Sequence, residues 1–168
     1  MFYVDIGLNV HELYMSGYIT PKGEWQHVSV TEQTGLQVAS GGSLASQAFS
    51  TGATGVFEHL YIADANSNVW DIQSTPRQGT AVSWSGAQDV SYANLGNKFG
   101  PPSGSPLAVT YNLLCSYGCE PGVGTEQVFW IDGSPTVVAS YSIPNPSMAG
   151  WRYFSQLTYG TGAPPPAP

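Results

Sequence analysis

Residues 59–73 carry the sequence HLYIADANSNVWDIQ. Two short runs rich in Val, Ile, Tyr and Trp flank the turn-forming residues Asp64 to Asn68, which is the pattern of a β-hairpin. The pattern occurs twice more, as FYVD (2–5) before NVHELY (9–14) and as QVFWID (127–132) before TVVASY (136–141). A tryptophan follows each copy: Trp25, Trp84 and Trp151. The chain therefore predicts one hairpin unit repeated three times.

The spacing within the units supports this repeat. Glu12 to Trp25 and Asp71 to Trp84 are both 13 positions, and Ala139 to Trp151 is 12. A second recurring element, small residues before a strand, occurs at 41–49 (GGSLASQAF) and 103–111 (SGSPLAVTY). Short strands at a fixed period are typical of radially repeated folds whose units bury their faces against neighbours. We therefore expect an all-β fold without helices, a β-propeller built of about three four-stranded blades.

The repeat sets the expected boundaries. Residues 1–161 form the propeller repeats, with units at about 1–40, 41–102 and 103–161, and the first unit lacks its first strand. Residues 162–168 form a proline-rich tail. Asp5 to Asp64 is 59 positions and Asp64 to Asp132 is 68, which places an insertion around CSYGCEPGVG (115–124). Because propellers typically have ~4–8 blades, we expect either association of copies, with a dimer giving six blades, or a longer parent chain.

Composition excludes several partners. Eleven carboxylates against four Lys and Arg give a net charge of −7, which repels nucleic acid and anionic membrane surfaces. No run approaches the roughly 20 apolar residues of a membrane span, and the start MFYVDIG lacks the pattern of a signal peptide. Cys115 and Cys119 fit either a local disulfide or two thiols and do not assign a compartment.

The order of the motifs resembles the fucose-binding β-propeller lectins of fungi and bacteria. The resemblance rests on VHELY (10–14) after a strand ending in aspartate, the following tryptophan, TEQTG (31–35) or LTYGTG (157–162), and SPLA (105–108). It spans nearly the whole chain. It implies a multivalent carbohydrate-binding protein with sugar pockets between adjacent blades, fucose as the first candidate sugar, and a secreted or extracellular location.

The resemblance also implies site residues. Glu12 and Asp71 match the acidic position that accepts hydrogen bonds from sugar hydroxyls, whereas Ala139 occupies it in the third unit. His59 and Gln127 stand nearest to the position of a basic residue, and no arginine is present there. The expected ligand-binding set is Glu12, Trp25, His59, Asp71, Trp84, Gln127 and Trp151, with the tryptophans as stacking platforms. The pocket of His59 and Asp71 is the first candidate.

Each of these residues has a structural alternative. A recurrent tryptophan fits a core wedge between sheets as well as a ligand platform, and Glu12 or Asp71 alone could be a solvent-facing carboxylate. His11, His27 and His59 do not cluster in the repeat frame, so no metal site or cofactor is expected. DANSN (64–68) resembles the start of a calcium loop but lacks its glycine and closing glutamate.

Catalysis is not expected. No GxSxG, P-loop or HExxH motif occurs. Arg77 and Arg152 lie in different units, so a three-arginine carboxylate site cannot form within one chain. Two hypotheses remain, a carbohydrate-binding lectin and a non-catalytic propeller module that is structural or docks proteins.

Overall fold

The computed structural model describes residues 1–16, 24–50, 56–75, 82–91, 100–112, 125–134, 136–142 and 151–157. Cys115, Cys119 and the tail 162–168 lie outside these residues. The described residues form eleven strands and one short helix. None of the described helical segments is long and apolar enough to cross a lipid bilayer.

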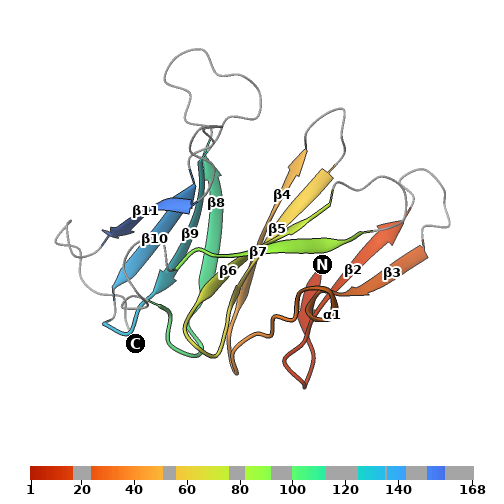
Figure 1. Cartoon of the computed structure of the whole chain (residues 1–168), viewed down its shortest axis with the longest axis horizontal. Helices are drawn as coiled ribbons and strands as arrows, with labels where there is room; N and C mark the ends of the chain where they lie inside the picture. Colours follow the sequence, from red (N-terminus) through yellow and green to blue (C-terminus); the bar gives the residue numbers. More distant parts are fainter. Residues whose placement is uncertain are drawn as a thin grey trace, which may run out of the picture.

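The strands form three antiparallel sheets that follow one another in chain order (Figure 1). The first sheet contains β1 (Phe2–Val4), β2 (Val10–Ser16) and β3 (Glu24–Ser29). The second contains β4 (Leu44–Ser50), β5 (Val56–Ala63), β6 (Val69–Ser74) and β7 (Trp84–Asp89). The third contains β8 (Leu107–Asn112), β9 (Thr125–Ile131), β10 (Val137–Ser142) and β11 (Trp151–Gln156). The all-β class and the succession of blade-like sheets are thus confirmed.

Strand register shows that the three units match at their recurrent positions. The acidic position of each unit pairs with an aromatic residue on the preceding strand, and each recurrent tryptophan pairs with the residue three positions after that acidic position. The first set of pairs is Phe2↔Glu12, Tyr61↔Asp71 and Phe129↔Ala139. The second is Met15↔Trp25, Ser74↔Trp84 and Ser142↔Trp151. Equivalent positions in the sequence are therefore equivalent positions in the sheets.

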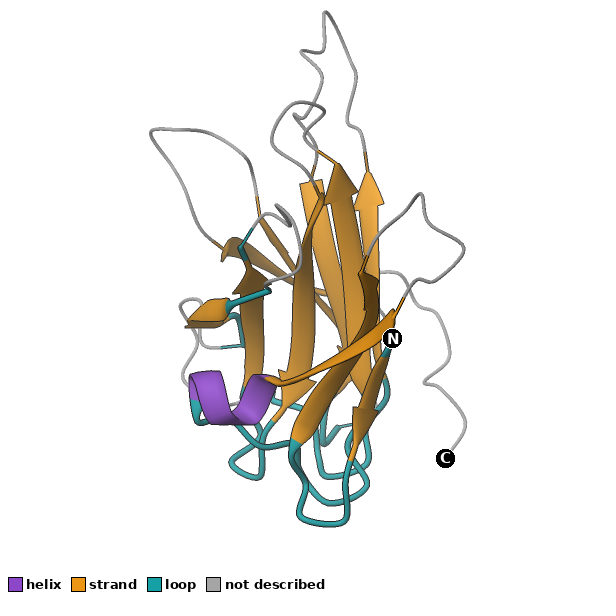
Figure 2. Ribbon diagram, turned by 90° about the vertical axis from the view of Figure 1, so that its right-hand side faces the viewer, coloured by secondary structure: helices purple, strands orange, loops and turns teal. Residues whose placement is uncertain are grey.

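Aspartate side chains close the three hairpin turns. Asp5 Oδ1 accepts from the backbone N–H groups of Gly7 (2.8 Å) and Asn9 (2.9 Å). Asp64 and Asp132 accept from the corresponding N–H groups at 2.8–3.0 Å. These are Asx turns, as the spacing predicted, and most of the described turns gather at one end of the sheets (Figure 2).

The other carboxylate oxygen of each turn aspartate differs among the units. Asp5 Oδ2 accepts from Asn9 Nδ2 (3.1 Å) and contacts His11 Nε2 (3.0 Å), and Asp64 Oδ2 accepts from Asn68 Nδ2 (3.0 Å) and Trp70 Nε1 (2.9 Å). The Asn9 side chain, together with His11, holds the pKa of Asp5 well below its usual range. In the third unit, threonine and valine replace these donors. Asp132 Oδ2 is buried and has no hydrogen-bond partner among the described residues.

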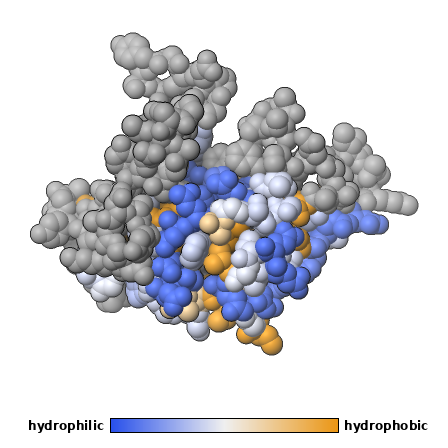
Figure 3. Space-filling view, viewed as in Figure 1, coloured by the Kyte–Doolittle hydropathy of each residue, from blue (hydrophilic) through white to orange (hydrophobic). Residues whose placement is uncertain are grey.

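The second sheet is buried on both faces. Leu60 and Ile62 of β5 pack into a core shared with the first sheet, together with Trp84. Tyr61 and Ala63 pack into a core shared with the third sheet, and the 2% exposed Trp130 joins them. Because side chains alternate across a strand, consecutive residues of β5 serve different cores. In the space-filling view, hydrophobic residues are visible mainly in the middle of the described face, bordered by hydrophilic ones (Figure 3).

A short helix, α1 (Val30–Thr34), corrects the expectation that the chain contains none. The Ser29 side chain accepts from the Glu32 backbone N–H (3.2 Å), and Gly35 ends the helix at φ 74°. A serine cap three residues before glutamate and a left-handed glycine are ordinary helix start and stop signals. The helix connects two sheets, because Thr31 Oγ1 accepts from Val10 N (2.8 Å) and Gln33 Oε1 accepts from Trp84 N (2.6 Å).

Candidate functional site

The junction of the second and third sheets contains a cluster of ionisable side chains. His59 Nδ1 lies 3.2 Å from Asp71 Oδ1 and 3.0 Å from Glu126 Oε2. The side chains are 12% (His59), 1% (Asp71) and 7% (Glu126) exposed. An imidazole thus bridges two nearly buried carboxylates that come from two different sheets.

Strand alternation places these groups on facing surfaces. His59 and Tyr61 are two residues apart on β5, so both point toward the third sheet, and Tyr61 pairs with Asp71 of β6. Glu126 lies at the start of β9 and shares its face with Val128 and Trp130, which pack in the core between these sheets. The cluster therefore forms the polar end of an otherwise apolar junction.

The two carboxylates keep the imidazole charged. Burial disfavours the charged form of His59, but its hydrogen bonds and charge interactions with Asp71 and Glu126 outweigh that cost and raise the pKa of His59 to about 9. Burial, together with the same negative charges, raises the pKa of the Tyr61 hydroxyl. At neutral pH the cluster therefore contains an imidazolium and a neutral phenol beside the carboxyl groups of Asp71 and Glu126.

This arrangement is suited to binding hydroxyl groups. Ionised carboxylate oxygens only accept hydrogen bonds, and charge-assisted bonds are stronger than neutral ones. Glu126 Oε1 is buried and has no hydrogen-bond partner among the described residues. Polar acceptors beside apolar walls are the usual composition of a small-molecule site.

The junction of the first and second sheets contains a different pair. Trp84 is 2% exposed, and its Nε1 donates to Oε2 of the fully buried Glu12 at 3.0 Å. The Phe2 ring meets the Trp84 ring edge to face, with centroids 5.5 Å apart. Here the recurrent tryptophan of one unit reaches the recurrent acid of the preceding unit. Trp84 is therefore buried between the two sheets, as expected for a core wedge.

The remaining expected site residues are not brought into either cluster. Trp25, on β3, is 62% exposed on the outer face of the first sheet. Gln127 alternates with Glu126 on β9 and so lies on the outer face of the third sheet. Ala139 of β10 occupies that same face, opposite Phe129. Trp151 begins β11, and its side chain lies outside the described residues.

Sequence reasoning missed Glu126 and Tyr61. Glu126 precedes Asp132 by six positions, as Glu58 precedes Asp64, so the repeat marked this glutamate as a recurrent residue. For Tyr61 the sequence predicts only a place on a strand. The cross-strand pair that it forms with Asp71 follows from the hairpin register, which the turn at Asp64 fixes.

Two of the three histidines, which do not cluster in the repeat frame, lie together in the first sheet. His11 Nδ1 and His27 Nε2 are 3.0 Å apart on neighbouring strands of the first sheet. The sequence separates these residues by 16 positions. Only the pairing of β2 with β3 brings them together.

No protein-family model matches the chain, and no curated protein matches it. Among solved structures, the chain is similar to one described as a fucose lectin from Kordia zhangzhouensis in complex with methyl-fucoside. The two share 13% sequence identity with a TM-score of 0.48, and the match covers 92% of this chain and 95% of that chain.

Proposed function

We propose that this chain is a carbohydrate-binding lectin whose principal sugar site is the junction of His59, Asp71 and Glu126. The observation that carries the proposal is the pair of nearly buried carboxylates, one from each sheet, beside a charged imidazole. Neighbouring sugar hydroxyls donate to such carboxylates.

Fucose or a related sugar is the first ligand to test. His59 occupies the place where an arginine would be expected from the resemblance, so the cation of this site is smaller and has fewer donors. We expect weak affinity at one site, increased by repeated sites when several engage one surface. The junction of the first and second sheets, with Glu12 and Trp84, is the second candidate sugar site. Trp25 and Trp151 are the candidate stacking residues of the other units. Gln127 occupies the position in the third unit that His59 occupies in the second.

The test is a glycan array with labelled protein, followed by calorimetric titration with the sugars that bind. Asp71→Asn and Glu126→Gln keep the side-chain shapes but remove the charges, so both should reduce binding at least tenfold. Glu32→Gln is the matched control, because Glu32 lies on α1, away from the junction. Circular dichroism must show that each variant is folded. Unchanged sugar binding in both folded junction variants would exclude this site.

A second candidate function, a protein-docking module, is favoured by the outer face of the first sheet. Trp25, Met15 and Tyr3 are 62%, 53% and 40% exposed on this face. Exposed aromatic and methionine side chains are enriched at protein interfaces. A glycan array without signal from the folded wild-type protein, together with partner binding lost in Trp25→Ala, would favour this function over the lectin.

We further propose that copies of the chain associate, with the outer face of the first sheet of one copy against the outer face of the third sheet of another. In the repeat frame, Trp25 corresponds to Trp84, and Ala139 of the third sheet corresponds to Glu12, which Trp84 contacts. One copy's first sheet can therefore pack on the next copy's third sheet as neighbouring sheets do within the chain. Two copies give six sheets, and light scattering should then give twice the chain mass of 17.8 kDa. A monomeric mass at micromolar concentration would exclude this association.

A further inference from the structure

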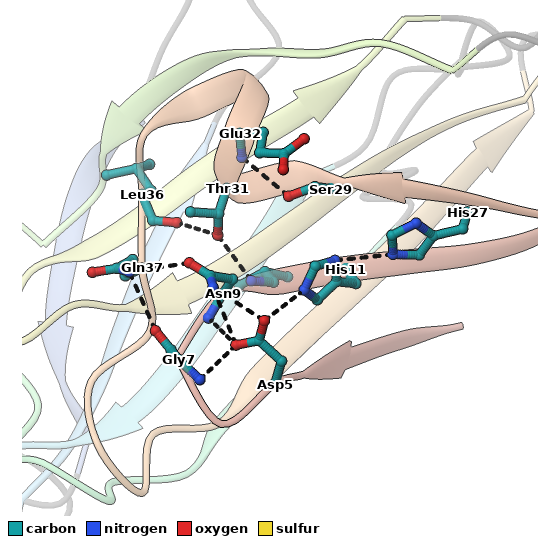
Figure 4. A network of polar contacts seen from close by, with 11 residues as sticks. Asp5, Gly7, Asn9, His11, His27, Ser29, Thr31, Glu32, Leu36 and Gln37 are labelled. Atoms are coloured by element: carbon teal, nitrogen blue, oxygen red, sulfur yellow. Dashed lines mark hydrogen bonds and ion pairs between the residues drawn. The ribbon is translucent and has the colours of Figure 1, made fainter.

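The outer face of the first sheet aligns three polar side chains in a row (Figure 4). His27 Nε2 lies 3.0 Å from His11 Nδ1, and His11 Nε2 lies 3.0 Å from Asp5 Oδ2. His11 and His27 are diagonal neighbours across β2 and β3, because His11 pairs with Ser29 and Leu13 pairs with His27. The row therefore depends on strand register and on the first hairpin turn.

Asp5 sets the tautomer of His11. Its Oδ1 is used by backbone N–H groups of the turn, and its Oδ2 faces His11 Nε2. A carboxylate oxygen accepts, so His11 carries its proton on Nε2 and directs the lone pair of Nδ1 toward His27. The Tyr3 ring stacks on the His11 ring, with centroids 5.0 Å apart and an interplanar angle of 21°, which limits rotation of the imidazole.

We propose that His11 Nδ1 and His27 Nε2 together bind a divalent transition-metal ion, with Asp5 orienting His11 from behind. Two imidazole nitrogens that bind one ion at about 2.0–2.1 Å, with an angle of about 90–109° between them, are about 3 Å apart. The two nitrogens are hydrogen-bonded to each other at 3.0 Å, so an ion would replace this hydrogen bond and lie beside the line that joins them. His27 provides its lone pair by moving its proton from Nε2 to Nδ1, so binding requires no net loss of a proton.

The chemistry of the ligands selects the class of ion. Imidazole suits Cu²⁺, Ni²⁺ and Zn²⁺, whereas Mg²⁺ and Ca²⁺ require oxygen ligands. Carboxylate, histidine and metal in a row is the usual arrangement at protein metal sites. His27 is exposed in the single chain, so water can occupy the remaining coordination positions there. The site lies on the outer face of the first sheet and is independent of the proposed sugar junction.

The test is titration of the full chain with Cu²⁺, followed by calorimetry and by electron paramagnetic resonance. We expect one ion per chain and a spectrum with two nitrogen ligands. His27→Gln should weaken binding at least tenfold without affecting the fold. Glu24→Gln is the matched control, since it removes another metal-binding side chain from the same strand, and it should bind as the wild type does.

Asp5→Asn distinguishes the proposed site from nonspecific binding of copper to histidines. The asparagine oxygen can still close the turn, but its amide nitrogen then donates to His11 Nε2 and moves the ring proton to Nδ1. Copper affinity should fall by about 10–100-fold, and ¹⁵N NMR should show the changed tautomer of His11. Unchanged copper affinity in folded His27→Gln, or absence of a one-to-one site in the wild type, would overturn the proposal.

Discussion

Raising the pH through the pKa of His59 should destabilise the protein. In the native state Asp71 and Glu126 raise this pKa to about 9, whereas an unfolded chain has a histidine pKa of about 6.5. Between these values the native state holds a proton that the unfolded state does not, so the free energy of unfolding falls as the pH rises. The contribution is fully present below pH 6.5 and is lost by about pH 9.

The size of the effect follows from the shift. A change of this size in the pKa of His59 corresponds to about 3 kcal/mol, a large part of the ~5–15 kcal/mol that stabilises a typical domain. The assay is urea unfolding followed by fluorescence at intervals between pH 6 and pH 10. The wild type should lose about 3 kcal/mol across this range, mostly above pH 7.

His59→Gln isolates the contribution, because it retains every other titrating group. Its stability should be lower at pH 6 and should change little between pH 7 and pH 9. NMR titration of the folded wild type gives the pKa of His59 directly, even if the variant does not fold. A measured His59 pKa near 6.5, or an equal loss of stability in wild type and variant, would refute the reasoning.

Three further predictions concern stability and are measured by urea unfolding at pH 7. Trp84→Phe removes the indole donor to a buried carboxylate and should lower the free energy of unfolding by about 2 kcal/mol or more. The same change at the exposed Trp25 should alter it by no more than about 0.5 kcal/mol. Equal losses in the two variants would contradict the assigned burial. Thr136→Asn supplies the donor that Asp132 Oδ2 lacks and should stabilise the protein by about 1 kcal/mol, and a loss of stability would show that the turn cannot accept the amide. Ser29→Ala removes the cap of α1 and should cost about 1 kcal/mol, unless the helix contributes nothing to folding.

The strands and their pairing were predictable because local rules determine them. Alternating apolar residues and an aspartate turn fix each hairpin, and the repeat transfers the register from one unit to the next. The capping signals of α1 were also present between Ser29 and Gly35. They do not predict the helix by themselves, because a helix of this length has no apolar periodicity.

The candidate site was only partly predictable. His59 and Asp71 belong to one hairpin, so their approach follows from its register. Glu126 lies 55 residues after Asp71 in the chain and belongs to another sheet, so its approach depends on how two sheets pack. Trp25 and Trp84 occupy the same position in their units but differ in burial, since only Trp84 has another sheet of this chain in front of it. Sequence equivalence cannot distinguish an interior sheet from the first one.

The alternation of β5 between two cores restricts how the length of this chain can vary. Removal of one residue near Leu60 would exchange the faces of the strand and move Tyr61 away from Asp71 into the opposite core. A change at a loop leaves both faces intact. The observed difference in length between units leaves β5 and β9 in register, since five of the nine additional residues lie among 113–124, between β8 and β9, and the other four lie between Trp84 and Leu107. Variants of this protein should therefore gain or lose residues in the connections and keep the number within β5 unchanged.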